Sequence, residues 1–146
     1  MINDSIQPTG TLDVVLKKAD GTIKEKYKFK NLVVTTGKEF IAARMIDDST
    51  PKMSVMAIGD SNSNLDVTNT SLQSELGSVS LESSTVENNV VTYTAEFGAG
   101  VGTGGVVEAG IFDGESAPTM LCRTTFPVIN KESDDILTIN WNVTIN

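Results

Sequence analysis

The chain has 146 residues, no histidine, one cysteine and a formal net charge of −8. Without histidine the usual general base is missing, so a hydrolase of the Ser-His or Cys-His type cannot be assembled. A single cysteine excludes an intrachain disulfide and argues against a zinc site, and the acidic balance argues against nucleic acid and anionic membranes as partners.

The length suits one domain, residues 1–146, with residues 1–30 as an N-terminal arm and hairpin. Hydrophobic residues make up 39% of the chain, and Ser, Thr, Asn and Gly are abundant, which favours short strands joined by turns. No apolar run reaches the roughly 18 residues that a membrane span needs, and residues 1–10 lack the features of a signal peptide. We expect an all-β domain without a secretion signal.

The first elements are predicted from turn and capping signals. Residues 11–16 and 22–30 read as two strands of a hairpin, because Asp20-Gly21 between them suits a tight turn. Thr36 and Glu39 have the spacing of a helix capping box. The sequence therefore predicts one short helix over residues 37–47, with apolar residues on most of its circumference.

The middle of the chain contains apolar runs separated by turn residues. We expect a short helix over 70–76 and a loop over 59–64. The remaining apolar runs predict strands at 53–58, 79–81, 90–97, 106–112 and 120–126. An asparagine turn precedes residues 90–97, a glycine-rich loop at 98–105 follows them, and Pro127 helps to end the last of these strands.

The last segment has the clearest period. Apolar residues from Leu137 to Ile145 alternate with Thr and Asn, which predicts a strand with one buried and one solvated face. Trp141 belongs to the apolar face. Eight or nine short strands with one helix favour an antiparallel β-sandwich, with the jelly roll as one form of it.

Charge is distributed unevenly along the chain. Residues 1–30 contain six lysines and four acidic residues, a balance of +2, while residues 31–146 carry a balance of −10, which together give −8. On an extended strand the lysines of residues 24–30 share one face, the lysine stripe, which consists of Lys24, Lys26, Lys28 and Lys30. This stripe is either a solvated face that discourages edge pairing or a docking surface for an acidic partner.

The glycine-rich loop contains Gly100, Gly102 and Gly105 at the spacing of a dinucleotide-binding motif. That motif requires a helix after it, whereas residues 106–112 read as a strand. We therefore expect a loop between strands, and so many glycines allow it to lie close against a neighbouring subunit.

The other candidate sites have simpler interpretations. Asp60-x-Asn62-x-Asn64 begins like a calcium loop but lacks the later glycine and glutamate, so it reads as a turn held by its side chains. Cys122 lies in an apolar strand and reads as a buried residue. Glu108 and Arg123 are candidates for a cross-strand pair. We predict no catalytic residues, no metal and no cofactor, and hence not an enzyme.

Several short words occur in an order that we recognise: AIGD at 57–60, TSLQSELG at 70–77, VTYTAEFGAG at 91–100, VVEAGIFD at 106–113 and TMLCRTTFPV at 119–128. Over residues 31–146 this order resembles the small all-β virion structural proteins of tailed bacteriophages. The words AIGD and EAGIFD also resemble the attachment domain of phage tail-collar fibres.

The resemblance implies a capsid decoration, or cement, protein that bridges subunits of the major capsid protein on the exterior of the virion, after assembly in the cytoplasm of the host bacterium. It implies a small homo-oligomer, with a trimer favoured. An alternative is a tail adaptor or fibre-attachment protein bound to tail or baseplate proteins. A further alternative is a carbohydrate-binding β-sandwich module, against which the few aromatic residues count.

Overall fold

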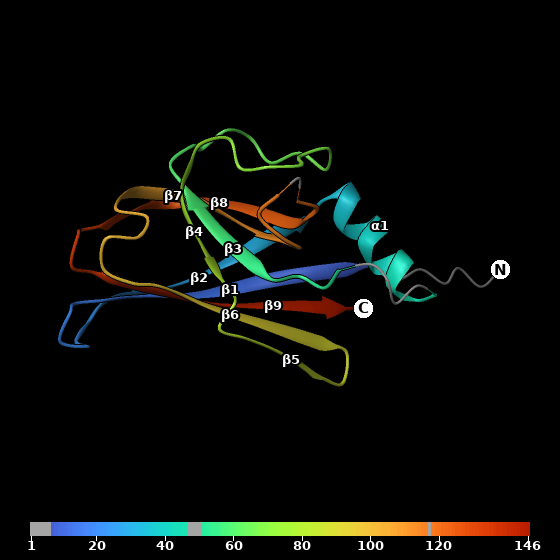
Figure 1. The fold of residues 1–146 in the computed structure, drawn as a ribbon, viewed down its shortest axis with the longest axis horizontal. Coiled ribbons are helices and arrows are strands. Elements are labelled where there is room, and N and C mark those ends of the chain that lie inside the picture. The colour runs from blue at the N-terminus through green and yellow to red at the C-terminus, as the bar shows by residue number, and fades with distance from the viewer. Residues whose placement is uncertain (1–6, 47–50, 117) are drawn as a thin grey trace.

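The computed structural model describes residues 7–46, 51–116 and 118–146 (Figure 1). Nine strands form one antiparallel sheet in the order β4-β3-β7-β8-β2-β1-β9-β6-β5, with the helix α1 (Thr35–Arg44) at one end. The strands are β1 (Pro8–Lys17), β2 (Ile23–Val33), β3 (Val55–Gly59), β4 (Glu75–Ser80), β5 (Ser83–Glu87), β6 (Val90–Phe97), β7 (Gly104–Phe112), β8 (Met120–Lys131) and β9 (Ile136–Ile145). Within the described residues, no helix has the length and apolar character that a membrane span needs.

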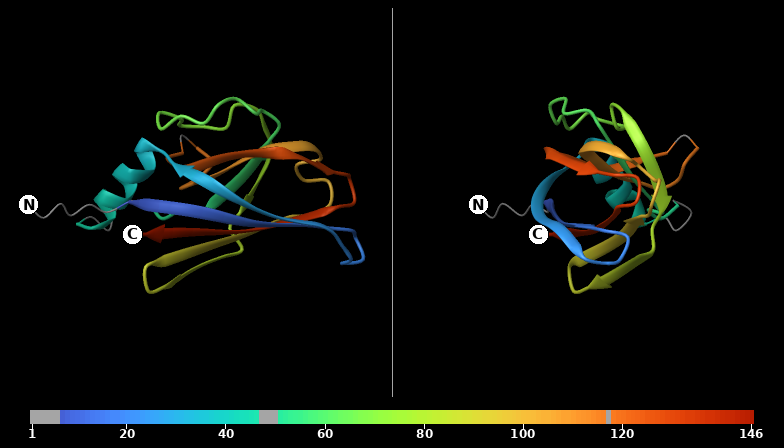
Figure 2. Two further views of the ribbon diagram at one scale, coloured as in Figure 1. Left: turned by 180° about the vertical axis from the view of Figure 1, so that it is seen from behind. Right: turned by 90° about the vertical axis from the view of Figure 1, so that its left-hand side faces the viewer.

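The sheet curls strongly, so that its two halves face each other across one core, as the view along its length shows (Figure 2). β2 joins the halves, because it pairs with β1 along most of its length and with β8 only through Leu32 and Val33. The all-β class is confirmed, but the predicted two-sheet sandwich, and with it the jelly roll, is wrong. Strand twist accumulates across many strands, so one sheet can bury its own apolar face as a half-barrel.

The core fills the concave side of this half-barrel. β1 and β9 alternate between buried and partly exposed residues, which confirms the alternation predicted for the end of the chain. On the outer face of β9 and its neighbour β6, Thr92 and Thr94 of β6 donate hydrogen bonds to the side chains of Asn142 and Asn140 of β9 at 2.7 and 2.8 Å. One face of this half is therefore apolar and the other is a polar surface.

The two edge strands are consecutive in the chain. β4 forms one edge of the sheet and β5 the other, so the link between them crosses from one half to the other. Leu81 donates its N–H to the carbonyl of Ser54 in one half, and Glu82 donates to the carbonyl of Thr94 in the other, both at 2.8 Å. This crossing connects the two edges of the half-barrel.

The N-terminal hairpin is confirmed. Gly21 has a φ of +89°, and Asp20 accepts a hydrogen bond from the backbone N–H of Thr22 at 2.9 Å, as the Asp-Gly signal predicts. The hairpin occupies the centre of the sheet between β8 and β9, so its strands are part of the core layer. Residues 1–6 of the predicted arm lie outside the described residues.

The predicted helix is confirmed, but its first and last residues and its N-cap differ from the prediction. It spans Thr35–Arg44, and residue 47 of the predicted range lies outside the described residues. The capping box is wrong, because the N-cap is Val34 and the Thr36 hydroxyl donates to the carbonyl of Met120 at 2.7 Å. Gly37 packs so closely on the backbone of Leu121 that a Cβ would clash there. Tertiary contacts with β8 therefore determine where α1 begins.

Two other local predictions are wrong, and one strand was not predicted. Residues 70–74 form part of a loop and not a helix, and Glu75 already begins β4. β5 was not predicted, because all five of its residues are exposed and it has no apolar period. β8 continues past Pro127 to Lys131, because the register between β7 and β8 shifts there and the bulge accommodates a residue without an N–H.

Trp141 is the largest fully buried side chain and has an exposed fraction of 0%. We expect Trp141→Ala to lower the free energy of unfolding by about 3 to 5 kcal/mol, because it leaves a large cavity. Trp141→Phe is the matched control, since it keeps an aromatic ring in the core and removes the second ring with an indole N–H that has no hydrogen-bond partner among the described residues. Urea unfolding measures both, and an alanine variant as stable as the phenylalanine variant would contradict the buried position.

Candidate interaction surface

The connection between β3 and β4, loop 60–74, folds back over the outer face of the sheet, at the top of the molecule in Figure 1. Ala109 of β7 and Cys122 of β8 point into the core, so their neighbours Glu108 and Arg123 point to the opposite, outer face. Both outer side chains are nevertheless 0% exposed. They are buried because loop 60–74 covers them.

The carboxylate of Glu108 binds both ends of this loop. One oxygen accepts backbone N–H groups of Ser61 and Ser74 at 3.2 and 2.9 Å, and the other accepts the N–H of Gln73 at 3.1 Å. Gly59 lies beside the carboxylate, and a Cβ at that position would clash with Glu108 and with the carbonyl of Ser74. One carboxylate thus holds the entry and the exit of the loop together.

The guanidinium of Arg123 holds the middle of the loop. Its Nε and Nη2 both donate to Glu108 at 3.1 Å. Its Nη1 donates to the carbonyls of Ser63 and Asn64 and to the side chain of Asn69 at 3.2 to 3.5 Å, and Nη2 also donates to the hydroxyl of Ser63 at 3.1 Å. Every nitrogen of this buried cation therefore has an oxygen acceptor.

The predicted pair of Glu108 and Arg123 is confirmed, but its role was not predicted. The run from Asp60 to Asn64 is rich in oxygen-bearing side chains, and its sequence predicts a turn held by those side chains. In the structure, oxygens of this run surround a cation, and that cation is the guanidinium of Arg123. Among the described residues, no group of three or more His, Cys, Asp or Glu side chains is placed to hold a metal ion.

The loop also covers a second, smaller apolar cluster on the outer face. Leu72 packs against this cluster, which consists of Val34, Val55, Ala57, Phe112 and Met120. The carbonyl of Val67 accepts the N–H of Thr35, the first residue of α1, at 2.7 Å. The loop is therefore fixed by two charged side chains, by apolar packing and by the helix.

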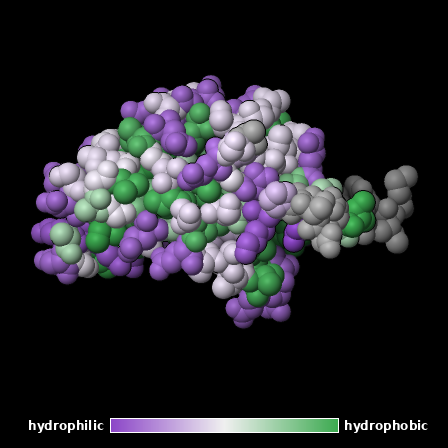
Figure 3. All heavy atoms as spheres, in the orientation of Figure 1, coloured by the Kyte–Doolittle hydropathy of each residue, from purple (hydrophilic) through white to green (hydrophobic). Residues whose placement is uncertain are grey.

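The outward side of the loop carries two exposed apolar side chains, Leu65 and Val67, with exposed fractions of 36% and 43%. Figure 3 shows hydrophobic residues interspersed with hydrophilic ones along the upper edge of the molecule, where the loop runs. Polar groups of the loop form hydrogen bonds within the loop. For example, the side chain of Asp66 accepts hydrogen bonds from the N–H and the hydroxyl of Thr68. The result is a fixed, mixed polar and apolar surface.

The lysine stripe is only partly as predicted. Lys24 lies where the register of β1 and β2 shifts, and its ammonium group pairs with the buried Asp135 at 2.9 Å. Lys28 lies 3.8 Å from the exposed Asp13, whereas Lys26 and Lys30 have no ion pair among the described residues. The part of the stripe without a close ion pair among the described residues therefore consists of Lys26, Lys28 and Lys30, the outer lysines.

The stripe also borders an unpaired strand edge. β2 meets β8 only at Leu32 and Val33, so most of this side of β2 has no strand beside it. Stacking of Phe29 on Phe126, with ring centroids 4.8 Å apart, fills part of the gap from the inside. Lysines on such an edge discourage pairing with another strand, which fits the interpretation of the stripe as a solvated face. The same exposed lysines are accessible to an acidic partner, so the geometry also fits the interpretation as a docking surface.

The glycines of the 98–105 loop serve contacts within the chain. Gly102 has a φ of +69° and lies so close to Ile58 that a Cβ would clash. The carbonyl of Gly98 accepts the ammonium group of the buried Lys131 at 2.8 Å. Gly105 is the second residue of β7, so the glycine-rich loop leads into a strand and not a helix, as predicted. Gly100, at a φ of +79°, has open space where a Cβ would lie.

Two other residues lie where the sequence predicted. Cys122 is completely buried, and burial raises the pKa of its thiol well above the usual range. Trp141 faces the core, so it offers no stacking platform for a sugar. This burial counts against the carbohydrate-binding alternative.

No family model matches the chain, and neither a curated protein nor a solved structure matches it.

We expect Arg123→Met to lower the free energy of unfolding by about 3 to 5 kcal/mol, because it leaves the carboxylate of Glu108 buried without a cation. The double variant Glu108→Gln/Arg123→Met removes both charges, so its loss should be smaller than the sum of the two single losses. Urea unfolding measures these energies. In these variants, the amides of Gln73 and Ser74 should exchange their hydrogens faster than in the unmodified protein, because both donate to Glu108. Additive losses with unchanged exchange would show that the pair does not hold the loop.

The pair of Lys24 and Asp135 predicts a pH dependence. The hydrogen bond from Lys24, followed by that from the N–H of Glu132, lowers the pKa of Asp135 below its usual range. The resulting stability is present above the unfolded pKa, about 3.9, and is lost as the pH falls through the lower folded pKa. Below about pH 4 the free energy of unfolding should therefore fall less steeply in Asp135→Asn and in Lys24→Gln than in the unmodified protein. Parallel curves would contradict the assignment.

Proposed function

We propose that this chain is a structural protein of a tailed-bacteriophage virion and that it works by contact through loop 60–74. The observation that carries the proposal is the attachment of this loop by the buried Glu108 and Arg123. Three of the words that resemble phage virion proteins meet at this point. AIGD ends β3 where Gly59 pairs with Glu108, EAGIFD supplies Glu108, and TMLCRTTFPV supplies Arg123.

Energetics support a role for this loop beyond joining two strands. A hairpin connection needs only about two to five residues, and each further ordered residue costs about 1 to 2 kcal/mol of backbone entropy. A buried ion pair is a poor source of net stability, since well-packed apolar residues do as well or better. An arrangement that costs free energy and holds a long surface loop in one shape is typical of binding loops.

Within this class we propose a capsid decoration protein that bridges subunits of the major capsid protein on the exterior of the virion. One compact curled sheet without a fibrous extension in its described residues suits this role. Each copy would add a modest buried area across a junction, and several joined copies would bind with increased avidity. The expected assembly in the host cytoplasm, without nucleic acid or membrane as a partner, belongs to the same proposal.

A tail adaptor is the second candidate, and one observation favours it. The two words shared with tail-collar fibre domains, AIGD and EAGIFD, run side by side in β3 and β7. AIGD leads directly into loop 60–74, and Glu108 of EAGIFD binds both ends of this loop. If that likeness reflects a common attachment role, the same loop would contact tail or baseplate proteins. The two candidates thus share the contact surface and differ in the location of the copies.

Loop variants and particle composition test the proposal. In particles of the phage that encodes the chain, we expect Leu65→Asp/Val67→Asp to lower the copy number at least tenfold, because two charges would be buried in the contact. Val86→Asp is the matched control, since Val86 is 71% exposed on β5, away from the loop. Quantitative mass spectrometry measures the copies, and antibody labelling locates them.

Labelling over the icosahedral shell supports the decoration protein, and labelling confined to the tail supports the adaptor. The proposal fails if unmodified particles lack the protein. It also fails if the loop variant is incorporated as well as the Val86 control while melting at the same temperature as the unmodified protein.

A further inference from the structure

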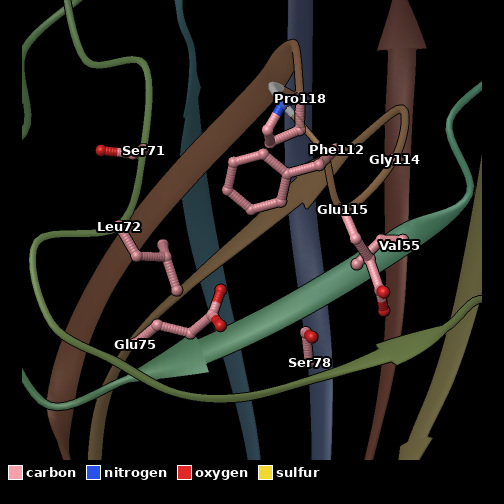
Figure 4. A pocket seen from close by; sticks show the side chains of 9 residues that line it. All are labelled: Val55, Ser71, Leu72, Glu75, Ser78, Phe112, Gly114, Glu115 and Pro118. Atoms are coloured by element: carbon pink, nitrogen blue, oxygen red, sulfur yellow. The ribbon is translucent and has the colours of Figure 1, made fainter.

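A second surface adjoins loop 60–74 and includes Ser71 and Leu72 at the end of that loop. It is an open pocket of about 360 Å³ on the outer face, which we call the acidic pocket. Its apolar wall consists of Val55, Leu72, Phe112 and Pro118, and the two acidic side chains are Glu75 and Glu115. Figure 4 shows Glu75 entering from the side of β4 and Glu115 from the turn after β7, with both carboxylates directed over β3.

Within the described part of the chain, the carboxylates of the acidic pocket have no partner of opposite charge. Neither Glu75 nor Glu115 forms an ion pair with any described residue. Two carboxylates around an apolar wall suit a cation with a long aliphatic stem, which is the chemistry of lysine. β4 also forms one edge of the sheet, so the pocket is open to an approaching chain.

The chain itself carries a matching surface. The outer lysines stand on alternate residues of one strand, at a spacing of about 6.6 to 6.8 Å, and all three are exposed. Lys26 and Lys30 have no ion pair among the described residues, and Lys28 has only a distant one with the exposed Asp13. β7 and β8 lie between β2 and β3 in the sheet, so these lysines do not reach the acidic pocket of their own chain.

We propose that the outer lysines of one copy bind the acidic pocket of a second copy. The two surfaces differ, so the contact is head-to-tail, and repetition of such a contact gives a closed ring when the rotation permits. At a net charge of −8, two copies repel each other at long range, and local complementarity is what allows them to associate. This inference deepens the proposed function, because it supplies the interface of the expected trimer.

Charge exchange in the purified protein tests this inference. One variant carries Lys26→Glu, Lys28→Glu and Lys30→Glu, a second carries Glu75→Lys and Glu115→Lys, and a third combines all five substitutions. Sedimentation at about 50 mM salt should show the unmodified chain above its monomer mass of 15.6 kDa, with weaker association at high salt. Each partial variant should associate at least tenfold more weakly, and the combined variant should recover most of the affinity.

Matched controls separate this contact from the effect of net charge and from misfolding. Lys18→Glu/Lys38→Glu/Lys52→Glu makes the same charge change at three lysines outside β1 and β2, and Glu82→Lys/Glu87→Lys makes the opposite change away from the pocket. Both controls should associate like the unmodified chain, and a thermal melt shows whether each variant is folded. An equimolar mixture of the two partial variants should also associate, because the acidic pocket is intact in the first variant and the outer lysines are intact in the second.

The inference is overturned if the unmodified chain stays monomeric at all salt concentrations. It is also overturned if neither the combined variant nor the mixture recovers association, which would assign the lysines or the pocket to a different partner. Particle incorporation of the loop variant tests the virion role independently, so the failure of one does not imply the failure of the other.

Discussion

The ion pair between Glu108 and Arg123 is the interaction on which the outer layer of this protein depends. It joins β7 to β8, and through its hydrogen bonds it holds both ends and the middle of loop 60–74. The loop in turn covers the outer apolar cluster and contacts the first residue of α1. Because a buried charge without its partner is costly, the pair and the loop are stable only together. The loop therefore has one preferred shape.

This outer layer explains why the two halves of the sheet have different sequence patterns. In the half that contains β1 and β9, the outer face is solvated, and apolar and polar residues alternate. In the other half, loop 60–74 covers the outer face, so β3 is buried at all five residues and β7 is buried at most of its length. The same sheet thus has one half with a single buried face and one half with two.

These patterns also determine what could be predicted from the sequence. The alternating end of the chain, the buried strand before Gly59 and the Asp-Gly hairpin were predicted, because each has a local signal. The sandwich was not correct, since a curled sheet and a pair of sheets bury the same alternating residues. The ends of α1, the exposed β5 and the bulge at Pro127 depend on contacts between distant segments. Glu108 and Arg123 could be predicted as a pair, because basic residues are few in this part of the chain. Their contacts with loop 60–74 could not be predicted, because these depend on where the fold places Ser63 and Asn69.

We propose that loop 60–74 is held in advance in the shape with which it contacts its partner in the virion. An electron-microscopy density map of the phage particle tests it most directly. We expect density for this chain in which loop 60–74 lies against a neighbouring virion protein and follows the same path around Arg123. A map in which the chain is bound through another face while loop 60–74 points into solvent would contradict it.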